Sequence, residues 1–491
     1  MHLTPSDVYT HYRPSKCDLR VYLKAHGAIS AQPSPYEKVL RVLGLRHEQR
    51  QLATLAEVED LAGIQDLAQL VERTKTAVVA GAPVIYQAML RANLTTDGIE
   101  CEVSGRPDFM IRDGDRYKIR DAKMSRRITE DDHPEILLQM QIYGWLFEQT
   151  FQSHASSLEV FAGTGEIVAI PYDGPEAVID ALKVIVSIRS LDSEPFSPVG
   201  TSKCGACGFH DYCWNRAEAI QAVALVPGVD QGLAITLDEQ GVRTIDQLLE
   251  RFDELSLSEL QRPQGTKLRR VGNRALSILR NAKALTSGIE ILLCKPEIPR
   301  FKNYVMFDLE GLPPQLDELQ KIYLWGMQVF GENPSEYIAS TAGFGVDGDR
   351  QGWEDFLVNA ASILDIHGDI PFVHWATYEA TFIKEYLRRY GDTTGRAARV
   401  QKNLLNLLPV TECSVVLPLS SYSLKTIEKY VGFERTQDEY GGSWSMAKYI
   451  EATETEDAVM RAEVMDAIRT YNKEDLAATW SVLQWLLEKT K

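Results

Sequence analysis

The sequence predicts an α/β protein built from several domains. Its 491 residues exceed what one hydrophobic core normally organises, and the length corresponds to about three domains. Strand-like alternation and helical periodicity follow one another in the first part of the chain and again in the last part. Between these parts lies a helical stretch broken by glycines. The pattern predicts domains at 1–220, 221–298 and 299–491.

The composition is that of a globular protein. Hydrophobic residues make up 44% and charged residues 25% of the chain. The net charge of −17 argues against a protein that coats nucleic acid by bulk charge, but carboxylates that hold divalent cations also make a nuclease acidic. The N-terminal segment has no basic part followed by an apolar run, and no apolar stretch approaches the roughly 20 residues of a membrane span. We therefore expect a cytoplasmic protein without a membrane partner.

The elements of the first part can be placed in order. Apolar residues at helical spacing predict a helix in 37–58. Alternation on both sides of the turn dipeptide Asp113-Gly114 predicts the strands of a hairpin in 98–124. The pattern then predicts a helix over 133–151, a second hairpin over 157–172 and a helix over 174–191.

The first hairpin carries residues suited to catalysis. Asp121 and Lys123 are two apart on a predicted strand, so both point to one face, and Asp108 on the neighbouring strand reaches the same place. Two carboxylates suit a hard divalent cation such as Mg²⁺ or Mn²⁺, which stabilises charge on a phosphate, and the lysine can orient the attacking water. The alternative is an ordinary hairpin with solvated charges, because an isolated D-x-K is common.

Helices flank this hairpin with further candidates. His47 lies on the predicted helix 37–58 and is a candidate metal ligand. Gln139 and Tyr143 are four apart on the helix 133–151, hence on one face, and are candidates for contact with a phosphate backbone. A histidine, then P-D, then D-x-K after one hairpin, then Q-x3-Y on the next helix resembles the RecB-like branch of the PD-(D/E)XK nucleases over residues 1–220. The resemblance implies a restriction-endonuclease-like mixed sheet with its catalytic residues in the P-D and D-x-K motifs.

Three of the seven cysteines stand close together in the stretch TSKCGACGFHDYCW (201–214) and suggest a metal site. Iron–sulphur-containing RecB-like nucleases, such as the AddB type and the CRISPR-associated ones, place one cysteine before the nuclease core and three after it. The resemblance implies that Cys17 joins Cys204, Cys207 and Cys213 around a [4Fe–4S] cluster. A structural Zn²⁺ is the alternative, because four thiolates also suit zinc.

The other three cysteines lie outside this pattern. An odd number of cysteines in so long a chain does not fit a secreted disulfide framework. Cys101, Cys294 and Cys413 stand in apolar or unclustered settings, so we predict that each is a small core residue.

The last part of the chain carries a second group of acidic residues. The pattern predicts strands over 303–311, 321–331 and 371–376, helices over 352–366 and 378–391, and a long final helix over 458–489. Asp308 and Glu310 end the first strand, two apart on one face. Tyr471 and Asp475 are four apart on the final helix, also on one face.

A strand D-x-E followed by a helical Y-x3-D resembles the DnaQ-like 3′–5′ exonucleases of the DEDD, tyrosine type, which have an RNase H-like fold. The resemblance implies that carboxylates hold two cations, about 4 Å apart, and that the tyrosine orients the water. In such families an acid also follows a strand-to-helix junction, and here that position holds Glu379, with His374 or Tyr378 lining the site. The alternative is that Glu379 is a first-turn helix residue favoured by the helix dipole.

The joining segment has a basic run. Its glycine-broken helices resemble tandem helix–hairpin–helix elements, in which turn N–H groups face a phosphate. Four side chains there are candidates for following a nucleic-acid backbone: Lys267, Arg269, Arg270 and Arg274. The alternative is an amphipathic linker with a solvated basic face.

The order of the three segments resembles a bacterial and archaeal family of RecB-like nucleases fused to an RNase H-like domain. We therefore expect an α/β multidomain protein with a restriction-endonuclease-like domain, a helix–hairpin–helix-like linker and an RNase H-like domain. The expected activity is metal-dependent cleavage of nucleic acid, DNA more than RNA, at single strands or ends, with two potential active sites. The alternatives are one live and one degenerate site, an RNA exonuclease, or a non-catalytic scaffold that binds nucleic acid.

Overall fold

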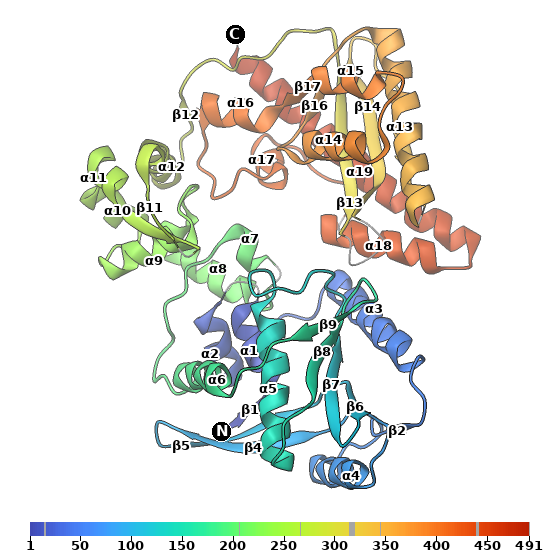
Figure 1. Cartoon of the computed structure of the whole chain (residues 1–491). Coiled ribbons are helices and arrows are strands. Elements are labelled where there is room, and N and C mark those ends of the chain that lie inside the picture. The colour runs from blue at the N-terminus through green and yellow to red at the C-terminus, as the bar shows by residue number, and fades with distance from the viewer. Residues whose placement is uncertain are drawn as a thin grey trace. The chain divides into compact units, whose positions relative to one another are not determined.

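The computed structural model of the chain describes residues 1–13, 16–205, 207–265, 267–313, 320–343, 345–437 and 441–490. The chain divides into two compact units, 1–197 with 202–212 and 198–201 with 213–491. Both are α/β structures with mixed sheets, as the sequence predicts (Figure 1). No helix within the described ranges has both the length and the apolar character needed to cross a bilayer.

The first unit is built on a six-stranded mixed sheet with the order β2-β3-β6-β7-β8-β9. Its strands are β2 (Val58–Asp60), β3 (Val84–Tyr86), β6 (Phe109–Asp113), β7 (Arg116–Ala122), β8 (Ser157–Phe161) and β9 (Ile167–Ile170). The two predicted hairpins are β6–β7 and β8–β9, both antiparallel, and β7 runs parallel to β8 between them. A smaller sheet has the order β1-β5-β4, formed by β1 (His2–Leu3), β5 (Ile99–Gly105) and β4 (Leu90–Thr96).

One predicted helix, α5 (Pro134–Phe151), packs against strands of both sheets in this unit. Its buried residues Met140 and Leu146 join the same core as Ile119 of β7. The other helices of this part are α1 (Pro5–Tyr12), α2 (Asp18–Ala25), α3 (Pro35–Leu52), α4 (Leu67–Val79), α6 (Glu176–Arg189) and α7 (Thr201–Cys204). Helix α3 is shorter than predicted because the chain leaves it at Leu52 and enters β2 at Val58.

The joining segment has its own hydrophobic core. After α8 (His210–Ala219) its helices are α9 (Gln231–Glu239), α10 (Ile245–Arg251), α11 (Glu254–Glu259) and α12 (Ala275–Ser287). The sequence predicts helix from Leu268 onward, which is wrong for the first residues. An antiparallel hairpin of β10 (Gln261–Gln264) and β11 (Lys267–Arg270) precedes α12 instead. The residues of β11 are all exposed, so no buried apolar face supports a helix there.

The last part of the chain forms a five-stranded sheet with the order β15-β14-β13-β16-β17. Its strands are β13 (Asn303–Leu312), β14 (Lys321–Gly331), β15 (Ile338–Thr341), β16 (Phe372–His374) and β17 (Leu404–Asn406). Strand β13 pairs antiparallel with β14 and parallel with β16, so it is central. The remaining helices are α13 (Gly345–His367), α14 (Tyr378–Tyr390), α15 (Arg396–Lys402), α16 (Leu407–Ser414), α17 (Leu424–Tyr430), α18 (Gly442–Glu454) and α19 (Ala458–Lys489).

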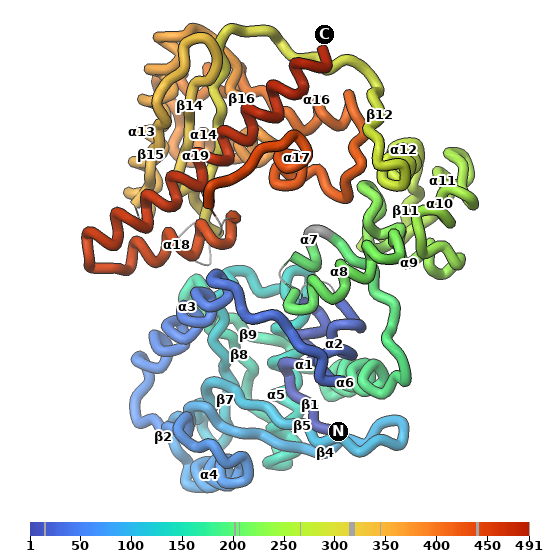
Figure 2. The backbone as a smooth tube through the Cα atoms, turned by 180° about the vertical axis from the view of Figure 1, so that it is seen from behind, coloured from blue at the N-terminus to red at the C-terminus, as the bar shows by residue number. Residues whose placement is uncertain are grey.

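The alternation of β13 decides where its acidic residues lie. Val305 and Phe307 belong to the core shared with α13 and α14, whereas Tyr304 and Met306 belong to the core shared with α19. Because side chains two apart share a face, Asp308 continues the second series and is directed toward α19. Figure 2 shows α19 crossing this face of the sheet.

Candidate active sites

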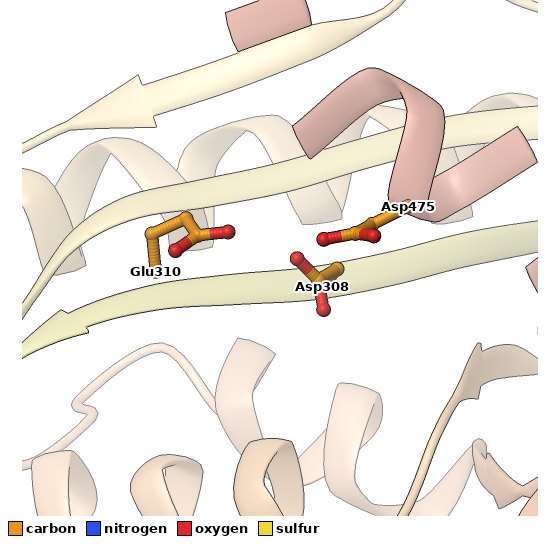
Figure 3. A group of neighbouring side chains, drawn as sticks. All are labelled: Asp308, Glu310 and Asp475. Atoms are coloured by element: carbon orange, nitrogen blue, oxygen red, sulfur yellow. The ribbon is translucent and has the colours of Figure 1, made fainter. Parts of the chain in front are cut away.

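Three carboxylates of the second unit come together as the sequence predicts. Asp308 and Glu310 lie on β13 and Asp475 lies on α19. One oxygen from each lies within 4.8 Å of the others, and no other group of three such ligands occurs within the described parts of the chain. Figure 3 shows the three side chains reaching into one space from the strand and the helix. Oxygen ligands at this spacing suit a hard divalent cation.

Each of these carboxylates has a partner that fixes its direction. Asn472 Nδ2 donates a hydrogen bond of 2.6 Å to Asp308 Oδ2. The Tyr323 hydroxyl lies 3.3 Å from an oxygen of Glu310 and donates to it. The carboxylate of Asp475 forms an ion pair with the guanidinium of Arg435. Two nitrogens of that guanidinium also donate hydrogen bonds to the carboxylate of Glu428, at 2.7 and 2.8 Å.

The carboxylates are held in an environment that disfavours their charge. Burial raises the pKa of Asp308 well above its usual value, and Asp475 and Glu310 raise it further. Burial also raises the pKa of Glu310, to about 8, with Asp475 contributing. Burial raises the pKa of Asp475 as well, although the guanidinium of Arg435 opposes the shift. A divalent cation at this position would oppose these shifts, because its attraction favours the charged form of each carboxylate.

Tyr471 and Glu379, the other predicted members of this site, are held beside it. Lys425 Nζ donates a hydrogen bond of 3.0 Å to the Tyr471 hydroxyl. Burial raises the pKa of that hydroxyl, and the three carboxylates raise it further, so it keeps its proton. Glu379 lies in the first turn of α14 and contacts His374 Nδ1 at 3.1 Å, outside the group of three. Its role as a metal ligand stays a prediction.

The sequence does not reveal the residue that orients Asp308. Asn472 is fully buried, and its Oδ1 accepts a hydrogen bond of 2.9 Å from the Tyr337 hydroxyl. Gly326 on β14 stands opposite Asp308 and leaves room for this amide, since a Cβ at Gly326 would lie 1.7 Å from Asn472 Oδ1. The only signal in the sequence is an asparagine within the Y-x3-D motif.

The first unit also brings its predicted acidic pair together. The backbone N–H of Asp108 donates to Asp121 Oδ1 at 3.2 Å, and the N–H of Ala122 donates to Asp108 Oδ2 at 2.7 Å. Lys123 Nζ lies 2.6 Å from Asp121 Oδ2. Burial raises the pKa of Asp108 well above its usual value, and Asp121 adds to it. Burial lowers the pKa of Lys123, but the two aspartates outweigh it, so the net shift is upward.

The structure gives His47 a backbone contact and connects its neighbour Glu48 to the aspartates. His47 Nε2 lies 3.0 Å from the carbonyl oxygen of Phe161, and the two rings stack with centroids 4.5 Å apart. Gln87 connects Glu48 to the aspartates, because its Nε2 donates to Glu48 Oε1 at 2.8 Å and to Asp108 Oδ1 at 3.0 Å. The sequence analysis missed Glu48, whose signal is an acid beside the predicted histidine. Metal binding by His47 stays a prediction.

Gln139 and Tyr143 lie on one face of α5, as predicted. Gln139 Nε2 donates to the Tyr143 hydroxyl at 3.0 Å, and that hydroxyl donates to the carbonyl of Arg106 at 3.3 Å. Tyr143 is buried, and burial raises its pKa, with Asp121 as the next cause. Its position is therefore beside the aspartates, and contact of either residue with a phosphate stays a prediction.

Comparison with known families finds one match in each part of the chain. The family model of the PD-(D/E)XK nuclease superfamily matches residues 21–214. That of the RNase H superfamily matches residues 305–487. The chain carries one domain of each superfamily. The crystal structure of SSO0001 is similar at 17% identity over 43% of this chain and 85% of that chain, with a TM-score of 0.23, which is too low to support an argument. No curated protein matches the chain.

The four predicted cluster cysteines are all partly exposed. Cys17 caps α2, and its Sγ lies 3.2 Å from Ser197 Oγ in the PD-(D/E)XK domain. Cys204 ends α7, and its carbonyl accepts a hydrogen bond of 2.9 Å from the N–H of Cys207. Cys213 lies on α8. Their role as ligands stays a prediction.

The prediction for the remaining cysteines is correct for one of the three. Cys101 is buried, but Cys294 and Cys413 are exposed. The reason is their position at the ends of short elements, Cys294 beyond β12 (Ile291–Leu292) and Cys413 in the last turn of α16 before β18 (Val415–Val416). Neither position lies on a face that packs into a core.

The predicted basic run is on the hairpin and not on a helix pair. Three of its members are exposed on β11: Lys267, Arg269 and Arg270. Arg270 pairs with Glu259 at 2.7 Å. Arg274 donates to the carbonyl of Gly228 at 2.6 Å. The run therefore presents positive charge on an exposed strand, and nucleic-acid binding by it stays a prediction.

Replacing Gly326 by alanine tests whether Asn472 orients Asp308. The added Cβ occupies the place of Asn472 Oδ1, so Asp308 loses its donor. Loss of such an outer partner typically weakens metal binding about 10- to 100-fold. We expect that loss in Mn²⁺ titration calorimetry of a chain whose PD-(D/E)XK site is inactivated by Asp121→Asn. Gly442→Ala is the control, because a Cβ there meets nothing within 4 Å. Equal Mn²⁺ affinity in both variants would contradict the assignment.

The raised pKa of Glu310 predicts how stability depends on pH and metal. Because the folded pKa of about 8 exceeds the ordinary 4.5, the metal-free folded state binds more protons than the unfolded chain between these values. Stability therefore falls as pH rises through this window, and Mn²⁺ restores it most at the upper end. Thermal melts at pH 6 and 8.5 with and without Mn²⁺ should show the larger metal shift at pH 8.5. Glu310→Gln should reduce that difference, and an equal shift at both pH values would contradict the account.

Proposed function

We propose that this protein is a divalent-metal-dependent nuclease that hydrolyses phosphodiester bonds of DNA, acting on single strands or ends. The observation that carries the proposal is the approach of Asp308, Glu310 and Asp475 in the RNase H domain, where one oxygen from each lies within 4.8 Å of the others. The PD-(D/E)XK domain of the same chain holds another acidic pair. The RNase H domain supplies a second potential site, for 3′–5′ exonuclease cleavage. Mg²⁺ or Mn²⁺ is the proposed ion at both sites.

In the PD-(D/E)XK domain, Asp108 and Asp121 present oxygens for the ion, which would stabilise charge developing on the phosphate. The backbone N–H groups of Asp108 and Ala122 hold these carboxylates in place. Lys123 stays protonated beside Asp121, because its pKa is raised, and its ammonium group is placed to orient the attacking water. Asp108 is half-buried and Lys123 partly exposed, which supports access by a substrate.

In the RNase H domain, Asp308, Glu310 and Asp475 are the proposed ligands, with Glu379 as a further acid at the edge. The Tyr471 hydroxyl keeps its proton and can donate a hydrogen bond to the attacking water. Lys425 holds that hydroxyl through its own hydrogen bond. The ion would stabilise charge on the attacking and leaving oxygens.

A [4Fe–4S] cluster on Cys17, Cys204, Cys207 and Cys213 is the proposed second cofactor, with Zn²⁺ as the alternative. Its proposed role is structural, because it would close the long loop between the N-terminal segment and the end of the nuclease domain. The basic strand β11 and the nearby Arg274 are the proposed contacts to the nucleic-acid backbone. We also propose that the first domain ends at residue 220 and that the joining segment ends at residue 298.

One specific observation favours an alternative function. Glu379 is paired with His374 and is not one of the three RNase H carboxylates whose oxygens lie within 4.8 Å of one another, although its charge raises the pKa of Asp308. A chain with a live PD-(D/E)XK site and a degenerate RNase H site fits that arrangement. The further alternatives, an RNA exonuclease and a non-catalytic scaffold, are outcomes of the same assay.

Nuclease assays on labelled single- and double-stranded DNA and RNA test the proposal. With Mg²⁺ or Mn²⁺ we expect cleavage of DNA, and Asp121→Asn should lower the rate of the PD-(D/E)XK reaction by roughly 10³-fold, the several kcal/mol that a metal supplies. Asp308→Asn should remove the 3′–5′ exonuclease products alone. If only Asp121→Asn has an effect, the RNase H site is degenerate. Inertness of the metal-loaded protein on every substrate would contradict the proposal.

Metal analysis of anaerobically purified protein tests the cluster. We expect brown protein that contains iron and acid-labile sulphide, and Cys207→Ser should lose both. Cys101→Ser is the matched control, since Cys101 is a buried core thiol outside the motif. Colourless protein carrying one zinc would reject the cluster in favour of the zinc site.

A further inference from the structure

Two exposed thiols meet where the joining segment enters the RNase H domain. Strand β12 pairs antiparallel with β18, with Ile291 opposite Val416 and Leu292 opposite Val415. The N–H groups of Leu293 and Cys294 both contact the carbonyl oxygen of Ser414, at 2.7 and 3.3 Å. Cys294 follows the end of β12 by two residues, and Cys413 lies in the last turn of α16, just before β18.

A direct contact brings the two cysteines together. Cys294 Sγ donates to the carbonyl oxygen of Cys413 at a distance of 3.3 Å. A disulfide requires two cysteines whose Cα atoms lie about 4.4–6.8 Å apart. The contact holds Cys294 Sγ against the backbone of Cys413, which is the approach that such a bond requires.

The two thiols are also accessible. Both cysteines are exposed, whereas Cys101 is buried and the other four belong to the proposed cluster motif. Thiol exchange requires that a sulphur be reached by an external reagent, and exposed pairs are the reversible ones in reducing compartments. Position and exposure therefore distinguish this pair from every other cysteine of the chain.

We propose that Cys294 and Cys413 form a reversible thiol–disulfide site whose oxidant is a low-molecular-weight disulfide. One cysteine thiolate attacks a sulphur of the oxidant, which forms a mixed disulfide and releases the first small thiol. The second cysteine thiolate attacks the protein sulphur of the mixed disulfide, which closes the Cys294–Cys413 bond and releases the second small thiol. Two electrons pass to the oxidant, and the two cysteine protons end on the released thiols.

The bond would strengthen a short connection. The β12–β18 ladder has only two register pairs, and the chain continues from β18 to α17, which carries Lys425 and Glu428. Oxidation would fasten the joining segment to the end of α16 covalently. It would therefore restrain the stretch that leads to Lys425, whose Nζ donates a hydrogen bond to the Tyr471 hydroxyl. This inference does not depend on the proposed nuclease activity.

Peptide mapping of the full-length protein tests the site. The protein is incubated with oxidised or reduced glutathione, free thiols are alkylated, and peptides are analysed by mass spectrometry without reduction. We expect a linked pair of peptides containing Cys294 and Cys413 after oxidised glutathione only, with loss of the link on adding dithiothreitol. On a non-reducing denaturing gel the oxidised chain should also migrate faster, because the bond closes a long loop.

Single serine variants supply the controls for this test. Cys294→Ser and Cys413→Ser should each abolish the link and the mobility shift, and both replace exposed side chains, so the fold should be kept. Cys101→Ser should retain both. Complete alkylation of the two cysteines in oxidised samples, glutathione on each cysteine separately, or a link to a different cysteine would overturn the proposal.

Discussion

The burial of three neighbouring carboxylates is the constraint on which the RNase H domain is organised. Burial disfavours the charge of each acid and raises its pKa, and because their oxygens lie within 4.8 Å of one another, the charges of Asp475 and Glu310 raise the pKa of Asp308 further. The surrounding residues oppose it with donors, namely the amide of Asn472, the hydroxyl of Tyr323 and the guanidinium of Arg435. Such an arrangement is unfavourable for stability alone and is typical of a functional site.

The PD-(D/E)XK domain also holds neighbouring carboxylates, but the groups that stabilise them are different. Its two aspartates are held mainly by backbone N–H groups at the hairpin ends and by the ammonium of Lys123. Backbone donors fix geometry without adding charge, whereas the RNase H site relies on side chains from several elements. The strand positions follow from the β6–β7 register, so the geometry of this site depends more directly on local structure.

The sequence predicts what depends on period and spacing. The D-x-E on β13 and the Y-x3-D on α19 could be placed on their faces because residues two apart on a strand, or four apart on a helix, share a side. Contacts between segments that are far apart in the sequence could not be predicted in this way. Gln87 links Glu48 to Asp108, and Cys294 contacts Cys413, only in the folded chain. The hairpin at 261–270 was missed because helical spacing in the following residues extends back into it.

Crystals grown with MnCl₂ and measured for anomalous scattering test the central claim most directly. The account predicts a manganese peak in contact with oxygens of Asp308, Glu310 and Asp475, and a second peak beside Asp108 and Asp121. Absence of manganese from the first position at saturating concentration, with these carboxylates still held by Asn472, Tyr323 and Arg435, would show that their approach is structural and would contradict the account.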